Sequence, residues 1–217
     1  MSSHCRIEWA SHTAADYACK RWHYSRRLPV FGTVKFGVWE DETFTGVVIF
    51  SRGATPLIGS PYGLRRTQVC ELTRIALRHD HRTAVSRIVA ICLRLLRKHA
   101  PGLRLVVSFA DEAQGHHGGI YQAGGWIYAG ASSTHAYEVN GIIEHPKTLH
   151  SRYGKGGQSI PWLQRHVDEN ARRIDVGKKH RYLMPLDDDM RRIVANLSKP
   201  YPRPKQAMAD SIGTAAV

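Results

Sequence analysis

Long apolar runs, paired cysteines and acidic residues are what this sequence has little of. No stretch approaches the ~20 apolar residues that a membrane span requires, and the start of the chain, MSSHCR, lacks the apolar segment of a secretory signal. The four cysteines, Cys5, Cys19, Cys70 and Cys92, form no CxxC or other zinc spacing. We therefore expect no membrane association, no disulfide framework and a cytoplasmic protein.

Signatures of the common catalytic classes are also absent. The sequence has no GxSxG nucleophile turn, no P-loop and no HExxH zinc motif. It contains 13 histidines. The pairs His79 with His81 and His116 with His117 could bind a metal, but we interpret them as solvated loop residues. These absences argue against the standard hydrolases, kinases and zinc peptidases.

Positive charge is what the chain has in excess. Lysine and arginine number 31 against 18 acidic residues, giving a formal charge of +13 and a pI near 9.9. Such a charge repels itself in a compact protein, and polyanions are its usual partners. The charge predicts a nucleic-acid partner, with solubility alone as the alternative, and it does not distinguish DNA from RNA.

Apolar periodicity predicts a mixed α/β fold. Strands are expected at 5–9, 33–40, 43–51, 69–77, 103–109, 126–131, 135–140 and 181–186, and helices at 12–22, 82–99 and 120–123. The central strand, helix and strand follow one another within a short stretch, which predicts a βαβ unit.

The length of the chain allows one sizeable core. We expect a single domain at 1–198, whose C-terminal part from about residue 144 is basic and contacts DNA. The Pro-, Ala- and Lys-rich end, 199–217, predicts a flexible tail. A homodimer is left open.

The order of these elements resembles that of the GCN5-related N-acetyltransferases. That resemblance implies a mixed, mostly antiparallel twisted sheet flanked by helices, in which two central parallel strands splay apart. It also implies acetyl-CoA or a related acyl donor, whose pyrophosphate rests on the N-terminus of the helix between those strands. This sequence has no glycine in the corresponding turn, so Arg82, Thr83 and Ser86 are the expected donor-binding residues.

A longer motif is more specific. The run SFADEAQGHHGGIYQAGGW at 108–126 resembles the core motif of the Mom proteins of Mu-like phages. Three shorter pieces match in the same order: WHY at 22–24, ELTR at 71–74 and HSRYGK at 150–155. The resemblance, over roughly 5–185, implies a transferase that converts adenine in DNA to an N6-carbamoylmethyl (methylcarbamoyl) derivative. That modification protects phage DNA from restriction in the host cytoplasm.

Two residues of the long motif are the expected acid and base. Adenine N6 is a weak nucleophile, so a base must take a proton as it attacks. Asp111 follows a buried strand, the usual place for site residues in open sheets, and is the candidate base or the group that orients the amine. Tyr121 resembles the acetyltransferase tyrosine that protonates a leaving thiolate. The alternatives are a turn-capping Asp111 and a packed Tyr121.

Four further residues complete the expected site. Arg74 on the central strand needs an anionic partner if buried, and Asp111, a phosphate or a donor carboxyl group would serve; a structural ion pair is the alternative. His23 and Tyr24 are expected to line the base pocket by stacking or proton relay, unless they only form a cluster at a helix end. Ser108 is expected to support the site.

The target base of double-stranded DNA must leave the helix or be single-stranded. This demands phosphate contacts, which basic residues supply. The expected DNA-contacting residues are Arg26, Arg27, Lys147, Arg152, Lys155, Arg172 and Arg173. Tyr, His and Asp side chains also suit iron, which is kept as a candidate metal.

Two other functions fit parts of the same pattern. One is an N-acetyltransferase that acts on an RNA or protein amine. The other is a nucleic-acid-binding protein that keeps the fold without catalysis. The missing glycine turn argues against a standard acetyltransferase, and the motif that holds Asp111 and Tyr121 argues against lost catalysis.

Overall fold

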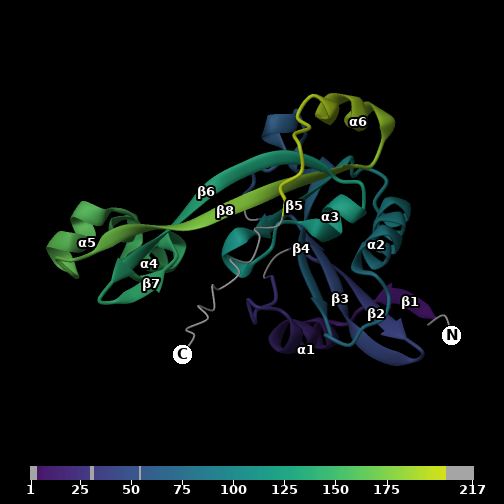
Figure 1. Ribbon diagram of the computed structural model, residues 1–217, viewed down its shortest axis with the longest axis horizontal. Coiled ribbons are helices and arrows are strands. Elements are labelled where there is room, and N and C mark those ends of the chain that lie inside the picture. The colour runs from purple at the N-terminus through teal and green to yellow at the C-terminus, as the bar shows by residue number, and fades with distance from the viewer. Residues whose placement is uncertain (1–3, 30–31, 54, 204–217) are drawn as a thin grey trace, which may run out of the picture.

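An eight-stranded sheet with strand order β1-β2-β3-β4-β5-β8-β6-β7 is the frame of the molecule (Figure 1). The computed structural model describes residues 4–29, 32–53 and 55–203. The strands are β1 (Cys5–Trp9), β2 (Val34–Glu40), β3 (Thr43–Ser51), β4 (Val69–Leu77), β5 (Leu105–Asp111), β6 (Ile127–Val139), β7 (Ile142–Glu144) and β8 (Arg172–Pro185). The helices are α1 (His12–Trp22), α2 (Val85–His99), α3 (Gly119–Ala123), α4 (Pro146–Tyr153), α5 (Ile160–His166) and α6 (Asp188–Ala195).

The pairing of β4 with β5 determines where a pocket can open. These two strands are parallel, and they pair only from Val69 with Leu105 to Leu72 with Ser108. Beyond that point β4 stays with β3, while β5 stays with β8 as far as the pair Asp111–Lys179. All other strand pairs are antiparallel. The predicted class, a mixed and mostly antiparallel sheet with splayed central strands, is confirmed.

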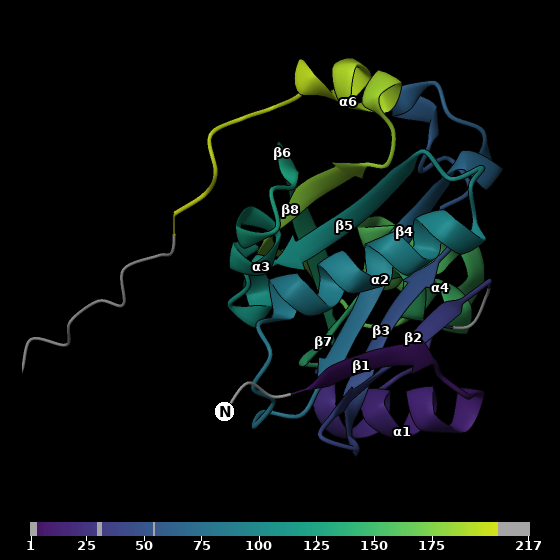
Figure 2. The same cartoon turned by 90° about the vertical axis from the view of Figure 1, so that its right-hand side faces the viewer.

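Helices cover both faces of the sheet. Successive side chains of β3 point to opposite faces, and the apolar ones on each face pack against a helix. Figure 2 shows where α1 and α2 lie against the sheet. Val48 and Phe50 belong to the cluster that contains α2, whereas Val47 and Ile49 pack with α1. The predicted helix 12–22 is confirmed. β2 and β3 form a hairpin whose two turn residues, Asp41 and Glu42, both have positive φ (45° and 65°), as a type I′ turn requires.

β6 and β8 continue beyond the sheet as a two-stranded ribbon (Figure 1). Its far end carries β7, α4 and α5, which enclose a separate small core of Tyr137, Val139, Leu149, Leu163 and Ala171. We call residues 132–178 the arm. The strands predicted at 126–131 and 135–140 are therefore one strand, and the strand predicted at 181–186 is the end of a longer one. The sequence of the ribbon lacks the alternation of apolar and polar residues that reveals a strand, because much of the ribbon is exposed on both faces.

Other details also differ from the prediction. The predicted helix 82–99 begins three residues later, at Val85, and α4, α5, α6 and β7 were not predicted. The strand predicted at 103–109 runs to Asp111, so this residue ends the strand and does not follow it. At the start of the expected tail, the Lys199 N–H bonds the Tyr128 carbonyl at 2.9 Å and the Tyr201 hydroxyl bonds the Trp126 carbonyl at 2.6 Å. The remainder of that tail, 204–217, lies outside the described residues.

Among the described residues, no helix combines the length and the apolar character that crossing a membrane takes.

Candidate active site

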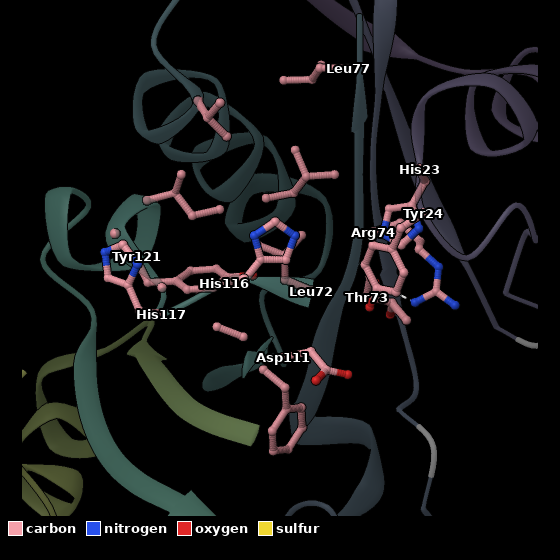
Figure 3. Close-up of a pocket in the computed structure, with 18 of the residues that line it drawn as sticks. His23, Tyr24, Leu72, Thr73, Arg74, Leu77, Asp111, His116, His117 and Tyr121 are labelled. Atoms are coloured by element: carbon pink, nitrogen blue, oxygen red, sulfur yellow. Dashed lines mark hydrogen bonds between the residues drawn. The ribbon is translucent and has the colours of Figure 1, made fainter. Parts of the chain in front are cut away.

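A cavity of about 720 Å³ lies where β4 and β5 part (Figure 3). The end of α1, the two strands and the segment 115–121 all contribute to its wall. The predicted site residues that line it are His23, Tyr24, Arg74, Asp111 and Tyr121. Residues separated by almost a hundred positions in the sequence thus line one pocket.

Asp111 and Tyr121 belong to the same wall but differ in exposure. The Asp111 side chain is 20% exposed, and its Oδ2 lies 3.9 Å from Nζ of Lys179. Its Oδ1 also accepts the backbone N–H of Ala113 at 3.1 Å, so Asp111 caps the next turn as well. Tyr121 is only 7% exposed. One carboxylate oxygen of Asp111, a residue that lines the pocket, therefore lies near Lys179.

A short hydrogen-bond chain runs behind Tyr121. The buried Ser108 hydroxyl lies 2.8 Å from both the Leu72 carbonyl oxygen and the Tyr121 hydroxyl. Because one hydroxyl carries one hydrogen, Ser108 donates to one of them at a time; while it donates to Leu72, it accepts from Tyr121. Burial raises the pKa of Tyr121 to about 12, despite the opposing hydrogen bond from Ser108. Tyr121 is therefore protonated near neutrality and can serve as an acid.

His23 and Tyr24 form the opposite wall. Burial, followed by the positive charge of Arg74, lowers the pKa of His23 to about 4, so its ring is neutral near pH 7. Nδ1 accepts the backbone N–H of Ser25 at 3.0 Å, which places the proton of the neutral ring on Nε2. The Tyr24 ring lies 4.3 Å from the His23 ring and remains 53% exposed. This wall offers an N–H donor beside an open aromatic surface.

Arg74 adds a positive charge to the same wall (Figure 3). Its guanidinium donates to the Thr73 carbonyl oxygen at 2.7 Å. Among the described residues it forms no ion pair, and Asp111, one expected partner, faces Lys179 instead. Arg74 is therefore available to an anionic or carbonyl group in the pocket.

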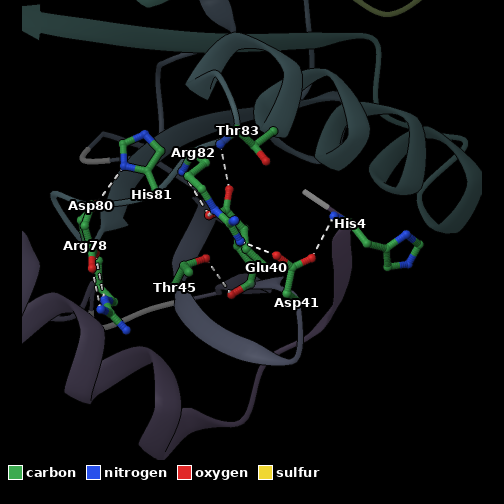
Figure 4. A network of polar contacts seen from close by, with 10 residues as sticks. His4, Glu40, Asp41, Thr45, Arg78, Asp80, His81, Arg82 and Thr83 are labelled. Carbon is green, nitrogen blue, oxygen red and sulfur yellow. Dashed lines mark hydrogen bonds and ion pairs between the residues drawn. The ribbon is translucent and has the colours of Figure 1, made fainter. Parts of the chain in front are cut away.

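The turn before α2 is occupied by two carboxylates of the β2–β3 hairpin (Figure 4). Glu40, 3% exposed, accepts the backbone N–H of Arg82 at 2.9 Å and that of Thr83 at 2.6 Å. The Arg82 guanidinium pairs with Asp41. Burial raises the pKa of Glu40, but the hydrogen bonds from Thr83 and Arg82 together outweigh it, so the net pKa is lowered.

These contacts change what can be expected of the three predicted donor-binding residues. The Arg82 guanidinium and the backbone N–H groups of Arg82 and Thr83 already have partners within the protein. Ser86 lies in the first turn of α2, which no side chain caps in the described structure. The helix end itself, and not the turn before it, is left as a candidate anion site.

Several expected DNA-contacting residues also have internal partners. Arg26 donates to the carbonyl oxygens of Lys20 and Arg21 at 2.6 and 2.7 Å, at the C-terminal end of α1. Arg152 bonds Glu144 at 2.8 Å, and Arg172 bonds Glu138 at 2.6 Å. The remaining members of the set, Arg27, Lys147, Lys155 and Arg173, are exposed and form no ion pair among the described residues.

Sequence reasoning missed two contributors. Lys179 faces Asp111 only because β8 pairs with β5, a pairing between strands that are about seventy positions apart. His116 was considered only as a metal ligand, yet its ring lies 6.2 Å from that of Tyr24. Across the described ranges, no group of three or more His, Cys, Asp or Glu side chains could hold a metal ion, so the iron prediction gains no support.

The strand order and the helix between two splayed strands define an acetyltransferase-like α/β protein. Similar solved structures include FeeM, an N-acyl amino acid synthase from uncultured soil microbes, which is 12% identical with a TM-score of 0.48. The comparison covers 90% of this chain and 98% of FeeM. A Bacillus subtilis acetyltransferase in complex with CoA is 13% identical, with a TM-score of 0.43 and coverage of 85% and 100%.

Sequence comparison gives the family. The model of the Mom protein family matches residues 4–203. The methylcarbamoylase mom of Escherichia phage Mu is 30% identical over 210 residues, which cover 94% of this chain and 85% of that protein. The chain belongs to the Mom protein family, and the resemblance seen in its motifs is confirmed.

Proposed function

We propose that this protein is a transferase that modifies the exocyclic N6 amine of adenine in double-stranded DNA, forming the methylcarbamoyl (carbamoylmethyl) derivative that protects phage DNA from restriction. Membership of the Mom family and the name of the Mu relative support the reaction. The observation that carries the proposal is the meeting of Asp111, Tyr121 and the Tyr24 wall in one open cavity of about 720 Å³.

The cavity suits a base that has left the DNA helix. An extruded base is held by stacking on aromatic rings and by hydrogen bonds to its edge. Tyr24 presents an exposed ring for stacking, and Nε2 of His23 and the Arg74 guanidinium are donors for adenine ring nitrogens. Asp111 accepts from the amine. The pocket therefore offers donors for the ring nitrogens of adenine and an acceptor for its exocyclic amine.

The two ends of the reaction are assigned to two residues. As N6 forms its new N–C bond and the bond between that carbon and the donor breaks, the amine gives up one proton, which Asp111 accepts; Nζ of Lys179 lies 3.9 Å from its Oδ2. Tyr121, with its raised pKa, gives one proton to the leaving group. Ser108 then turns its hydrogen towards Tyr121 and stabilises the phenolate until it is reprotonated.

An acyl donor of the acetyl-CoA type fits this chain at one place. The first turn of α2 is uncapped, so its N–H groups can receive a phosphate, and Ser86 adds a hydroxyl. Transfer of an acetyl group alone would give N6-acetyladenine, so the methylcarbamoyl product requires that the bound donor carry a carbamoylmethyl group, whose CH2 carbon would bond N6 as its bond to the donor breaks. Arg82 and Thr83 hold the site in shape through Glu40 and Asp41, and do not bind the donor directly.

Mass spectrometry of nucleosides from plasmid DNA tests the proposal. After expression of the wild-type chain we expect a new adenosine derivative, and in Tyr121→Phe, which keeps the ring and its packing, we expect that derivative to fall about a hundredfold. Unmodified DNA in cells that contain folded wild-type protein would refute the proposal. Acetylated RNA or protein, in that case, would favour the alternative acetyltransferase.

A further inference from the structure

A second cavity, of about 430 Å³, lies on the arm and has no part in the chemistry described above. The strand β6, the start of α4 and the end of the 3-10 helix η4 (Gly154–Gln158) form it. Its lining residues are Ser133, Thr134, His135, Tyr137, His145, Pro146, Lys147 and Gln158. None of these is acidic, although the arm contains acidic residues elsewhere. We call this cavity the arm groove.

The groove presents hydrogen-bond donors. Nδ1 of His145 accepts the backbone N–H of Lys147 at 3.1 Å, so the neutral ring carries its hydrogen on Nε2 and donates without being charged. Lys147 adds an exposed ammonium group, and Gln158 an exposed amide. The Tyr137 hydroxyl is already engaged, because it donates to the backbone carbonyl oxygen of Gln158 at 3.0 Å. A site with neutral and cationic donors and no acidic lining suits an anion with several oxygens.

The groove begins beside the catalytic pocket. Lys179, whose Nζ lies 3.9 Å from Asp111, is paired across the ribbon with Ser132, the residue just before the groove. Two strand spacings, about 10 Å, therefore separate the Asp111 strand from the β6 strand that forms the groove. Burial lowers the pKa of His145, and the positive charges of Lys179 and Lys147 lower it further. Lys179 thus acts electrostatically on both cavities.

From this arrangement we infer that the arm groove binds a backbone phosphate of the DNA strand that carries the target adenine, with Lys147, His145 and Gln158 as its donors and Lys179 as the link to the catalytic pocket. The inference rests on the proposed function for its partner. It assigns to the arm the role of fixing the position of the strand while the base is in the pocket, since phosphate contacts fix register and orientation.

A paired substitution tests the groove. Lys147→Met removes its ammonium group, while Lys98→Met removes the same charge from α2, far from the arm (Figure 1). Binding of a short fluorescent DNA duplex is measured over a series of salt concentrations, without any group donor. We expect Lys147→Met to weaken binding about tenfold and to reduce the salt slope by about 1, and Lys98→Met to leave both near wild type.

A second variant separates binding from folding. His145 is the N-cap of α4, and in His145→Asn the new side chain retains the capping oxygen, but its amide N–H lies closer to the backbone than Nε2 of the imidazole and reaches less far into the groove. We expect a smaller loss of affinity with an unchanged melting temperature. Equal salt slopes for Lys147→Met and Lys98→Met would overturn the inference. DNA binding that depends on Lys147 without any modified adenine would refute the proposed function instead and leave the groove standing.

Discussion

The pocket between β4 and β5 and the groove on the arm use their polar groups in different ways. In the pocket, burial shifts pKa values away from their ordinary range: the pKa of His23 is lowered to about 4 and that of Tyr121 is raised to about 12. On the arm, the cations are exposed, and two of them, Arg152 and Arg172, pair with glutamates. The pocket is therefore suited to proton transfer, whereas the arm is suited to attraction that depends on salt. Substitutions should separate the two functions.

The largest effect should come from Asp111→Asn, which removes the base but keeps a side-chain oxygen to cap the following turn. We expect formation of modified adenine to fall by about a thousandfold, with DNA affinity close to wild type. Quantified nucleoside mass spectrometry and duplex binding measure the two sides. If affinity fell as far as activity, Asp111 would be a DNA contact and the contrast between the regions would disappear.

A pH-dependent stability should follow from His23. Its pKa is about 6.5 in the unfolded chain and about 4 in the folded one, so the folded state excludes a proton that the unfolded state binds. Stability is full above pH 6.5 and declines as the pH falls towards 4, by up to about 3 kcal/mol. Urea denaturation of wild type and His23→Gln at pH 7 and pH 5 measures this. An equal loss in both proteins would contradict it.

Charge reversal on the arm should show the opposite behaviour. We expect Arg172→Glu combined with Arg173→Glu to weaken duplex binding about tenfold at low salt and less at high salt, because exposed charges are screened. Thermal melting should remain close to wild type, since the Arg172–Glu138 pair is exposed and surface pairs contribute little. Unchanged affinity with unchanged melting would show that these two residues do not contact DNA.

The smallest effect should come from Glu40→Gln. The amide oxygen still accepts one N–H but loses the charge, so we expect a loss of about 1 kcal/mol in the free energy of unfolding at pH 7. Because the folded pKa of Glu40 is lowered, its contribution is present above the unfolded value and disappears as the pH falls through the folded value. Denaturation at pH 7 and pH 3 should show that wild type and Glu40→Gln differ less in their free energy of unfolding at pH 3 than at pH 7. A difference that persists at pH 3 would point to packing.

Sequence reasoning succeeded where burial imposes a period. The helix 12–22 and the strands of the β2–β3 hairpin emerged from their apolar spacing, and the motif at 108–126 located the Asp111 and Tyr121 wall. It failed where contacts are long-range or the surface is exposed. The bonds from Glu40 to Arg82 and Thr83 join residues more than forty positions apart, and the arm ribbon has little buried area to impose alternation.

One strand, β8, runs unbroken from the small core at the tip of the arm to the edge of the main core, and on the way it is the hydrogen-bonded neighbour of the segment that ends in Asp111. The arm is consequently not a detachable appendage. A truncation that removed all of 132–185 would also expose the flank of β5, so loss of activity in such a protein would report a collapsed catalytic wall as much as a missing DNA contact. Point substitutions, and not deletions, are the informative perturbation for this architecture.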